Sequence, residues 1–469
     1  MKRFIILAIL LATTLTQAAS RQPNILFIAI DDLNDWVGKM GGHPQGATPN
    51  IDALADRGVL FANTHCAAPA CNPSRAALMT GVPPYKSGVY VNPQPWRPAM
   101  PWAVTIPQYL RQHGYSVKAS GKIFHGSYPD PASWDTYVPD QKQNKFGDPN
   151  PPKKSNNNGL KKGHFDWAPL PNEDSEMGDY KTADWISEQL ATPQSKPFFL
   201  ACGFYRPHLP WYVPQKYFDQ FPLDSIQLPK VMENDLGDIP KAGRQMAKPD
   251  GDHAAVVKHN EWKKAVQGYL ASIAFVDAQV GRVMKAYDKS PMKDNTLIVL
   301  WTDHGWHLGE KEHWRKFALW QDATRTPMIW MVPKGLSKAL PKGSAKNEIC
   351  TQPTSLLDIY PTLLDLCGLP PRADIAGKSL TPLIGSPQVH WERAVVTTHG
   401  RDNYSVQDHH WRYIRYADGS EELYDHRTDP NEWTNLAQVL THRSEINRLA
   451  AWIPTESVPD TEYDRGKKK

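Results

Sequence analysis

Three apolar runs, each followed by a polar cluster, most strongly restrict the folds open to this chain. Residues 24–30, 197–202 and 296–301 are almost continuously apolar, with many β-branched or aromatic side chains. Such runs are typical of strands that are buried on both faces of a parallel sheet. Amphipathic helical patterns lie between them, notably over residues 182–190 and 261–287. The alternation predicts an α/β domain with a large mixed, mostly parallel sheet sandwiched by helices.

Polar clusters follow the predicted strands at the edge where open α/β sheets place their sites. Asp31 and Asp32 end the first run, and Asp303 and His304 come directly after the third. The segments Gly121-Lys122-Ile123-Phe124-His125 and Arg206-Pro207-His208-Leu209-Pro210 follow two further strands. Taken singly, each has a plain alternative: a solvated turn for the acidic pair, a solvated lysine for Lys122, or a core position for His125.

A cysteine at the start of a predicted helix is the clearest candidate for chemistry. Residues 70–81 read Ala-Cys-Asn-Pro-Ser-Arg-Ala-Ala-Leu-Met-Thr-Gly. Pro73 suits the first turn of a helix, so Cys71 lies at the helix N-terminus, where free N–H groups and the dipole favour an anion. Arg75 adds a positive charge one turn later. A buried structural cysteine is the alternative that the C-x-P pattern alone leaves open.

The clusters together suggest a metal site beside a pocket for an oxyanion. Asp31, Asp32 and Asp303 offer hard oxygen ligands, which favour Ca²⁺ or Mg²⁺, while no Cys/His pair has zinc-like spacing. His304 either supplies a fourth ligand or holds the nucleophile. Positive charge and proton-transfer capacity suited to a small tetrahedral oxyanion come from Arg75, Lys122, His125, His208 and Lys316.

These motifs resemble those of the type I sulfatases in the alkaline-phosphatase-like superfamily, most closely the iduronate-2-sulfatase branch. Cys71 and the residues after it match the family's C-x-P-S-R and L-x-T-G signature. The other matching segments follow in family order: Asp31-Asp32, Gly121 to His125, Arg206 to Pro210, Asp303-His304-Gly305-Trp306 and Lys316. The resemblance covers nearly the whole mature chain, including the segments Leu423-Tyr424-Asp425 and Asp429 to Glu432.

The resemblance implies that Cys71 is converted to formylglycine by a formylglycine-generating enzyme, and that the aldehyde hydrate is the nucleophile. It implies one Ca²⁺ ion held by Asp31, Asp32, Asp303 and His304, with modified Cys71 completing the sphere. Many sulfatases carry Asn where His304 stands, so His304 matches the family pattern less closely than the aspartates do.

The resemblance also implies roles for the cations. Arg75 and Lys122 would steady the formylglycine, and His208 and Lys316 would grip the sulfate and the leaving oxygen. His208 would protonate the leaving alcohol. His125 would act as the base when the covalent sulfate leaves by elimination. For the sugar, Trp306 is a stacking candidate, with plain core packing as its alternative, and Arg206 is a candidate partner for a carboxylate or second sulfate.

The expected organisation is a signal peptide over residues 1–19, a catalytic domain over 20–387 and a smaller antiparallel C-terminal domain over 388–469. A basic start followed by a short apolar stretch predicts export to the periplasm or the medium, without a membrane anchor. The net charge of +4 is small for this length, so nucleic acid is not an expected partner. Cys350 and Cys367 could pair or stay free. Residues 128–173 are expected to form an irregular insertion.

The predicted substrate is an O-sulfated polysaccharide or glycosaminoglycan-like oligosaccharide, and a 2-O-sulfated uronic acid is the first choice. Two other functions stay open. A phosphonate or phosphodiester hydrolase of the same superfamily would use a similar set of residues. A sulfated-glycan-binding protein with inactive chemistry is the second alternative, although every expected catalytic position is filled.

Overall fold

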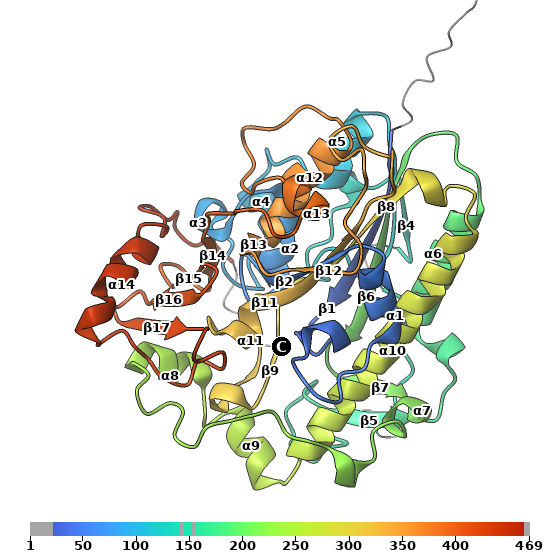
Figure 1. Cartoon of the computed structure of the whole chain (residues 1–469). Helices are drawn as coiled ribbons and strands as arrows, with labels where there is room; N and C mark the ends of the chain where they lie inside the picture. The colour runs from blue at the N-terminus through green and yellow to red at the C-terminus, as the bar shows by residue number, and fades with distance from the viewer. Residues whose placement is uncertain (1–21, 141–144, 152, 154, 464–469) are drawn as a thin grey trace, which may run out of the picture.

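The computed structural model of the protein describes residues 22–140, 145–151, 153 and 155–463, and is built around a nine-stranded sheet (Figure 1). Its strand order is β12-β2-β11-β8-β1-β6-β3-β4, and β13 also pairs with β2. Only β11 runs antiparallel to its neighbours among these strands. The strands are β1 (Asn24–Asp31), β2 (Val59–His65), β3 (Ser116–Gly121), β4 (Thr136–Val138), β6 (Phe198–Pro207), β8 (Thr296–Thr302), β11 (Arg325–Met331), β12 (Glu348–Cys350) and β13 (Thr354–Ser355). This arrangement confirms the predicted mixed, mostly parallel sheet.

Strand β1 explains why the first apolar run has no polar face. Its alternate residues enter two different cores, Ile25 and Phe27 on one side of the sheet and Leu26 and Ile28 on the other. Helices cover both faces (Figure 1). One layer contains α1 (Pro49–Asp56), α6 (Gly178–Ala191) and α10 (Trp262–Lys289), and the other contains α2 (Cys71–Thr80), α5 (Ile106–Gln112), α12 (Ile359–Leu366) and α13 (Thr381–Gly385).

The parallel register of the central strands aligns the polar clusters that follow them. Ala29 of β1 lies opposite Gly203 of β6 and Trp301 of β8, and Gly121 of β3 also pairs with Gly203. The four chain segments therefore leave the sheet at one carboxyl edge, as expected for a site in an open α/β sheet.

A second, antiparallel sheet lies near the C-terminus, in the order β14-β15-β16-β17 (Figure 1). Its strands are β14 (Val395–Thr398), β15 (Tyr404–Gln407), β16 (Trp411–Arg415) and β17 (Glu421–Asp425), and α14 (Arg443–Ala450) packs on it. Its Ile414 and Tyr424 share a core with Leu319 and Trp320 of the main unit. The small sheet thus rests on the segment that directly follows Lys316.

The remaining α-helices and strands, which alternate with short 3-10 helices, are short and connect these layers. They are α3 (Pro84–Ser87), α4 (Trp96–Ala99), α7 (Gln215–Phe218), α8 (Lys241–Ala247), α9 (Asp252–Lys258), α11 (Gln321–Thr324), β5 (Trp167–Leu170), β7 (Trp211–Pro214), β9 (His307–Leu308) and β10 (Trp314–Arg315).

Several sequence expectations need correction or completion. The insertion over 128–173 is not wholly irregular, because β4 extends the main sheet and β5 pairs with β7. All five cysteines are free and buried, so the disulfide between Cys350 and Cys367 does not form in this structure. The predicted signal peptide lies outside the described residues. Within the described part of the chain, no helix is long and apolar enough to cross a membrane.

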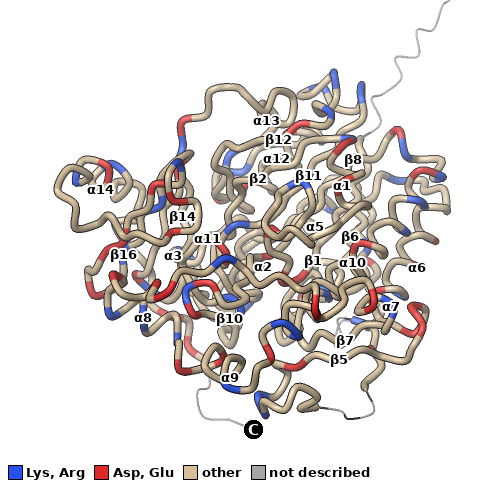
Figure 2. The backbone as a smooth tube through the Cα atoms, turned by 60° about the horizontal axis from the view of Figure 1, so that its bottom comes forward, with Lys and Arg blue, Asp and Glu red and all other residues tan. Residues whose placement is uncertain are grey.

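Charged residues of both signs are interspersed along the backbone (Figure 2). This distribution fits the small net charge of +4.

The N-terminus of helix α1 is capped by a residue that is distant in sequence. Thr48 precedes the helix, but its side chain makes no cap hydrogen bond. Instead the buried carboxylate of Asp277, on α10, accepts hydrogen bonds from the backbone N–H groups of Asn50 and Ile51, the shorter at 2.8 Å, and from the Asn50 side chain at 2.7 Å. These bonds satisfy N–H groups that a helix N-terminus leaves without intrahelical partners.

Replacing Asp277 with alanine is expected to lower the free energy of unfolding by about 3 kcal/mol, because it leaves buried donors without partners. The matched control is Asp288→Ala on the same helix, which removes an exposed ion pair with Arg57 (2.9 Å) and should cost under about 1 kcal/mol. Urea denaturation of the two variants measures the difference. Equal losses would contradict the capping role.

Candidate functional site

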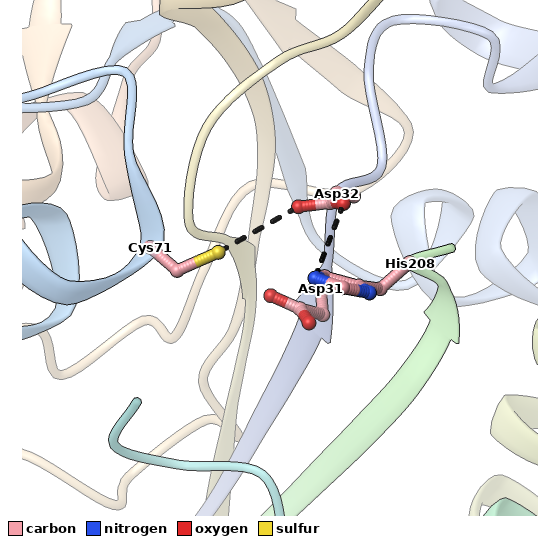
Figure 3. A group of neighbouring side chains, drawn as sticks. All are labelled: Asp31, Asp32, Cys71 and His208. Atoms are coloured by element: carbon pink, nitrogen blue, oxygen red, sulfur yellow. Dashed lines mark hydrogen bonds and ion pairs between the residues drawn. The ribbon is translucent and has the colours of Figure 1, made fainter. Parts of the chain in front are cut away.

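The site lies where β1, β3, β6 and β8 leave the sheet, beside the N-terminus of α2. Asp31 is the last residue of β1, and Asp303 follows β8. Lys122 follows β3, and His208 comes just after β6. Figure 3 shows Asp31, Asp32, Cys71 and His208 gathered in one space, with Cys71 entering from the helix side. The structure thus brings together the side chains that the sequence placed on separate segments.

Cys71 occupies the first position of α2 and is completely buried. Its Sγ lies 2.9 Å from Lys316 Nζ, 3.4 Å from His304 Nε2 and 3.8 Å from an Asp32 oxygen. Burial raises the pKa of the thiol well above its usual range, and the opposing charge of Lys316 is too weak to cancel that effect. The unmodified side chain is therefore a protonated thiol at neutral pH.

Arg75 bridges the carboxylates of Asp31 and Asp303. Its guanidinium donates to Asp31 and Asp303, each at 2.9 Å, and to the carbonyls of Lys122 and Ile123 at the same distance. The side chain has no exposed surface, so these bonds fix its orientation. Arg75 thus acts as a rigid positive centre that holds three of the site segments in place.

Two lysines bring ammonium groups against the aspartates. Lys122 forms an ion pair with Asp31, and Lys316 donates to Asp32 at 2.6 Å. Burial acts to raise the pKa of Asp31, but Lys122 and Arg75 outweigh it and hold that pKa well below its usual range. Both lysines keep raised pKa values despite burial, because carboxylates face them. They remain charged at any physiological pH.

Asp32 is held in an unusual position. Its backbone has a φ of +61°, which is uncommon outside glycine, and its carbonyl accepts a hydrogen bond from the Tyr269 hydroxyl at 2.7 Å. Burial raises the pKa of Asp32 to about 7, although Lys316 acts in the opposite direction. One carboxylate oxygen, Oδ2, is buried and has no hydrogen-bond partner among the described residues, since His208 Nε2 lies 3.8 Å away. A buried oxygen left in this way needs a cation or a proton.

The donor set fits a hard cation at this point. Ligand atoms of Asp32, Cys71, Asp303 and His304 all lie within 4.8 Å of one another, and Asp31 joins Asp32 and Cys71 in a second such group. Oxygen donors that face each other favour Ca²⁺ or Mg²⁺. The unpartnered Asp32 oxygen is the observation that supports a bound cation.

The histidines of the site are neutral in this environment. Nδ1 of His208 lies 2.6 Å from the Leu209 carbonyl, to which it donates, and Nε2 lies 3.8 Å from the unpartnered Asp32 oxygen. Burial and the charge of Lys122 hold the pKa of His208 well below its usual range. Burial, Lys122 and Lys316 lower the pKa of His125 to about 3, and burial lowers that of His304 to about 4.

Trp306 and Arg206, the two residues expected to contact the sugar, are both buried. Trp306 is 1% exposed and packs with Trp211 and Tyr269, so its surroundings match the packing alternative and leave no ring face for a sugar. Arg206 is also buried, and its guanidinium binds Asp148 at 3.0 Å and nearby carbonyls.

Supporting residues that sequence reasoning missed include Tyr269 and Ser74. Ser74 follows Cys71 within the recognised segment, and its hydroxyl donates to the Asp303 carbonyl. Tyr269 lies on α10, far from the site in sequence, and no local pattern distinguishes it from the other core-facing residues of that helix.

Comparisons with known proteins agree with this geometry. The family model described as "Sulfatase" matches residues 23–369, and the model "N-sulphoglucosamine sulphohydrolase, C-terminal" matches residues 309–455. The chain is 39% identical over 450 residues to a "Sulfatase" of Formosa agariphila, covering 92% of this chain and 86% of that protein. It is 30% identical over 394 residues to iduronate 2-sulfatase of Homo sapiens, covering 75% and 70% of the two chains.

Solved structures share the fold. One, described in complex with its substrate D-glucosamine-2-N,6-O-disulfate, superposes with a TM-score of 0.73 at 20% identity, covering 92% of this chain and 96% of that one. A phosphonate monoester hydrolase of Agrobacterium radiobacter superposes with a TM-score of 0.69 at 22% identity, covering 92% and 94%. At these identities the likeness concerns the fold alone.

Proposed function

This chain belongs to the sulfatase family and is a sulfuric ester hydrolase, and on that premise we propose that it removes sulfate esters from carbohydrates by means of a modified Cys71 and a calcium ion. The observation that carries the proposal is the surroundings of Cys71. A buried side chain at a helix N-terminus lies between the ammonium of Lys316 and a group of three aspartates. The lysines suit the oxygens of a bound sulfate ester, and the aspartates, which contact these cations, suit a metal ion.

Modification of Cys71 accounts for the chemistry better than the free thiol does. A buried thiol with a raised pKa is a poor nucleophile, because the thiolate is the reactive form. Formylglycine at this position, made by a formylglycine-generating enzyme, would supply an aldehyde hydrate as the attacking hydroxyl. Arg75 and Lys122 would steady such a group, and the ammonium of Lys316 lies 2.9 Å from the sulfur that it would replace.

Asp31, Asp32, Asp303 and His304 would hold the calcium ion. Bound there, the ion would supply positive charge against the oxyanion of the ester. The acidic pocket and the unpartnered Asp32 oxygen support this assignment.

The remaining residues position the sulfate and move protons. The ammonium groups of Lys122 and Lys316 attract its oxygens and stay charged throughout. With Nδ1 of His208 bound to a carbonyl, Nε2 is the atom that faces the site. An anionic ester near that atom raises the pKa of His208, which is the direction that a general acid for the leaving alcohol needs. Neutral His125 keeps a lone pair with which it can act as the base afterwards.

The substrate we propose is a sulfated glycosaminoglycan-like oligosaccharide, with a 2-O-sulfated uronic acid as the first choice. Similarity to iduronate 2-sulfatase supports this sugar. Export through residues 1–19 to the periplasm or the medium would bring the enzyme to such polymers.

Sulfate release from a panel of defined sulfated oligosaccharides, with an aryl sulfate as reference, tests the substrate class. We expect at least one sugar sulfate to exceed the aryl sulfate in kcat/KM by about tenfold or more. Turnover of the aryl sulfate alone would contradict the carbohydrate assignment. Binding of sulfated sugars without any turnover would instead favour the inactive glycan-binding alternative.

A further inference from the structure

Phe317 is a partly exposed aromatic residue immediately beside the catalytic pocket. Its ring centre lies 5.9 Å from Lys316 Nζ, which in turn contacts Cys71. Its backbone N–H donates to the carbonyl of Pro69 at 3.0 Å, in the loop that leads into α2. The φ of Phe317 is +75°, a conformation that a bulky residue adopts only under constraint. The local backbone thus holds this ring at the rim of the site, whereas Trp306 is buried.

Two hollows meet at Phe317. The larger, of about 440 Å³, lies between Phe317 and the small C-terminal sheet and is also lined by Lys248, His399 and Asn403. The smaller, of about 250 Å³, shares Phe317 and Lys248 and continues toward Arg315. Hollows of a few hundred cubic ångströms are of the size that holds small ligands. Phe317, the neighbour of Lys316, therefore faces a hollow that reaches the second sheet.

The larger hollow contains one lysine, Lys248, which has no ion-pair partner among the described residues. Lys248 is exposed, and among the described residues no carboxylate lies within ion-pair distance of it. The other charged residue of this hollow, Asp418, accepts hydrogen bonds from Ser420 and forms no ion pair with Lys248. Such an arrangement favours an anionic group near Lys248.

His399 adds a hydrogen-bonding group to the same space. Its ring centre lies 6.0 Å from that of Phe317, and its buried Nδ1 has no hydrogen-bond partner in the described part of the chain. Burial lowers its pKa to about 4, so the ring is neutral and can exchange hydrogen bonds with a hydroxyl.

We propose that Phe317, Lys248 and His399 form a subsite for the sugar next to the sulfated one, and that this sugar carries a carboxylate or sulfate. This inference rests on the proposed function and specifies its substrate as an anionic chain of at least two sugars. The apolar face of the sugar packs on Phe317, its anionic group pairs with Lys248, and a hydroxyl meets His399. His399 directly follows β14, so the small C-terminal sheet takes part in substrate selection.

Kinetics on a 2-O-sulfated uronic acid and on an anionic disaccharide that ends in it test the subsite. In Phe317→Ala and in Lys248→Ala we expect the ratio of kcat/KM for the disaccharide to that for the monosaccharide to fall about tenfold, mainly through KM. Lys248→Arg should restore most of the ratio, since it keeps the charge. Calorimetry with the disaccharide in a Cys71→Ala background should show about tenfold weaker binding for the same two variants.

Trp102→Ala is the matched control, because Trp102 is 57% exposed and lines neither hollow. It should leave the ratio unchanged. If the wild-type enzyme cleaves both sugars and the subsite variants keep the wild-type ratio, the subsite is wrong and the proposed function stands. If the wild-type enzyme cleaves neither of these sugars but does cleave another sulfated oligosaccharide of the panel, the subsite is wrong and the proposed function stands. If it cleaves no sulfated sugar at all, the proposed function fails and the subsite fails with it.

Discussion

Replacing Cys71 with alanine is expected to reduce sulfate release by roughly 10⁴-fold or more, the scale of loss seen when an enzyme loses its nucleophile. The reason is its position: Cys71 lies in the first turn of α2 and contacts Lys316, His304 and the group of aspartates. Wild-type protein made without the modifying enzyme should be folded and similarly inactive, because the buried thiol stays protonated.

The matched control is Cys202→Ala, since Cys202 is equally buried but lies in the apolar core of β6. It should keep most of the activity. Initial rates on one sulfate ester, with circular dichroism to confirm folding, measure all three proteins. A Cys71→Ala variant with more than about one hundredth of the wild-type rate would exclude Cys71 as the nucleophile.

Removing the carboxylate of Asp303 is expected to abolish turnover and metal binding together. Asp303 accepts from Arg75 at 2.9 Å and from the Asp32 backbone at 3.1 Å, and it belongs to the group of ligand atoms around Cys71. Asp303→Ala should lower the rate by about 10³-fold or more. Elemental analysis of the purified protein should fall from about one calcium per chain to nearly none.

Asp303→Asn serves as a second variant in case the alanine variant is unstable. Asparagine keeps the side-chain volume and an oxygen that can accept the hydrogen bond from Arg75. It should still lose most of the metal, since an amide oxygen carries no charge. Asp288→Ala, which removes an exposed carboxylate, is the control and should keep both calcium and activity. A metal-free Asp303→Asn enzyme with full activity would show that the assignment of the ion is wrong.

Most of the sheet could be predicted because burial on both faces leaves a clear signal. The apolar run over residues 24–30 has no polar alternation, and Ile25 and Leu26 indeed enter opposite cores. The same logic predicted the site, because a parallel register carries the residue after each strand to one edge. The family expectation drawn from the Cys71 segment is confirmed by the match over residues 23–369.

The features that sequence reasoning missed depend on contacts between distant segments. The cap of α1 comes from Asp277, and Thr48, which precedes the helix, only resembles a cap. The ring centres of Trp306 and Phe317 lie at similar distances from Lys316 Nζ, 5.3 and 5.9 Å. Trp306 is nevertheless buried, whereas Phe317 is partly exposed. That difference depends on Tyr269 and Trp211, which pack against Trp306 and lie far from it in sequence.

The most direct test of the central claim compares a sugar sulfate with its phosphate and phosphonate counterparts on the same enzyme preparation. The measured quantity is kcat/KM for release of each group from otherwise identical sugars. We expect the sulfate ester to be preferred by about 100-fold or more. Equal or faster turnover of the phosphate or phosphonate ester would contradict the account and favour the alternative hydrolase of the same superfamily.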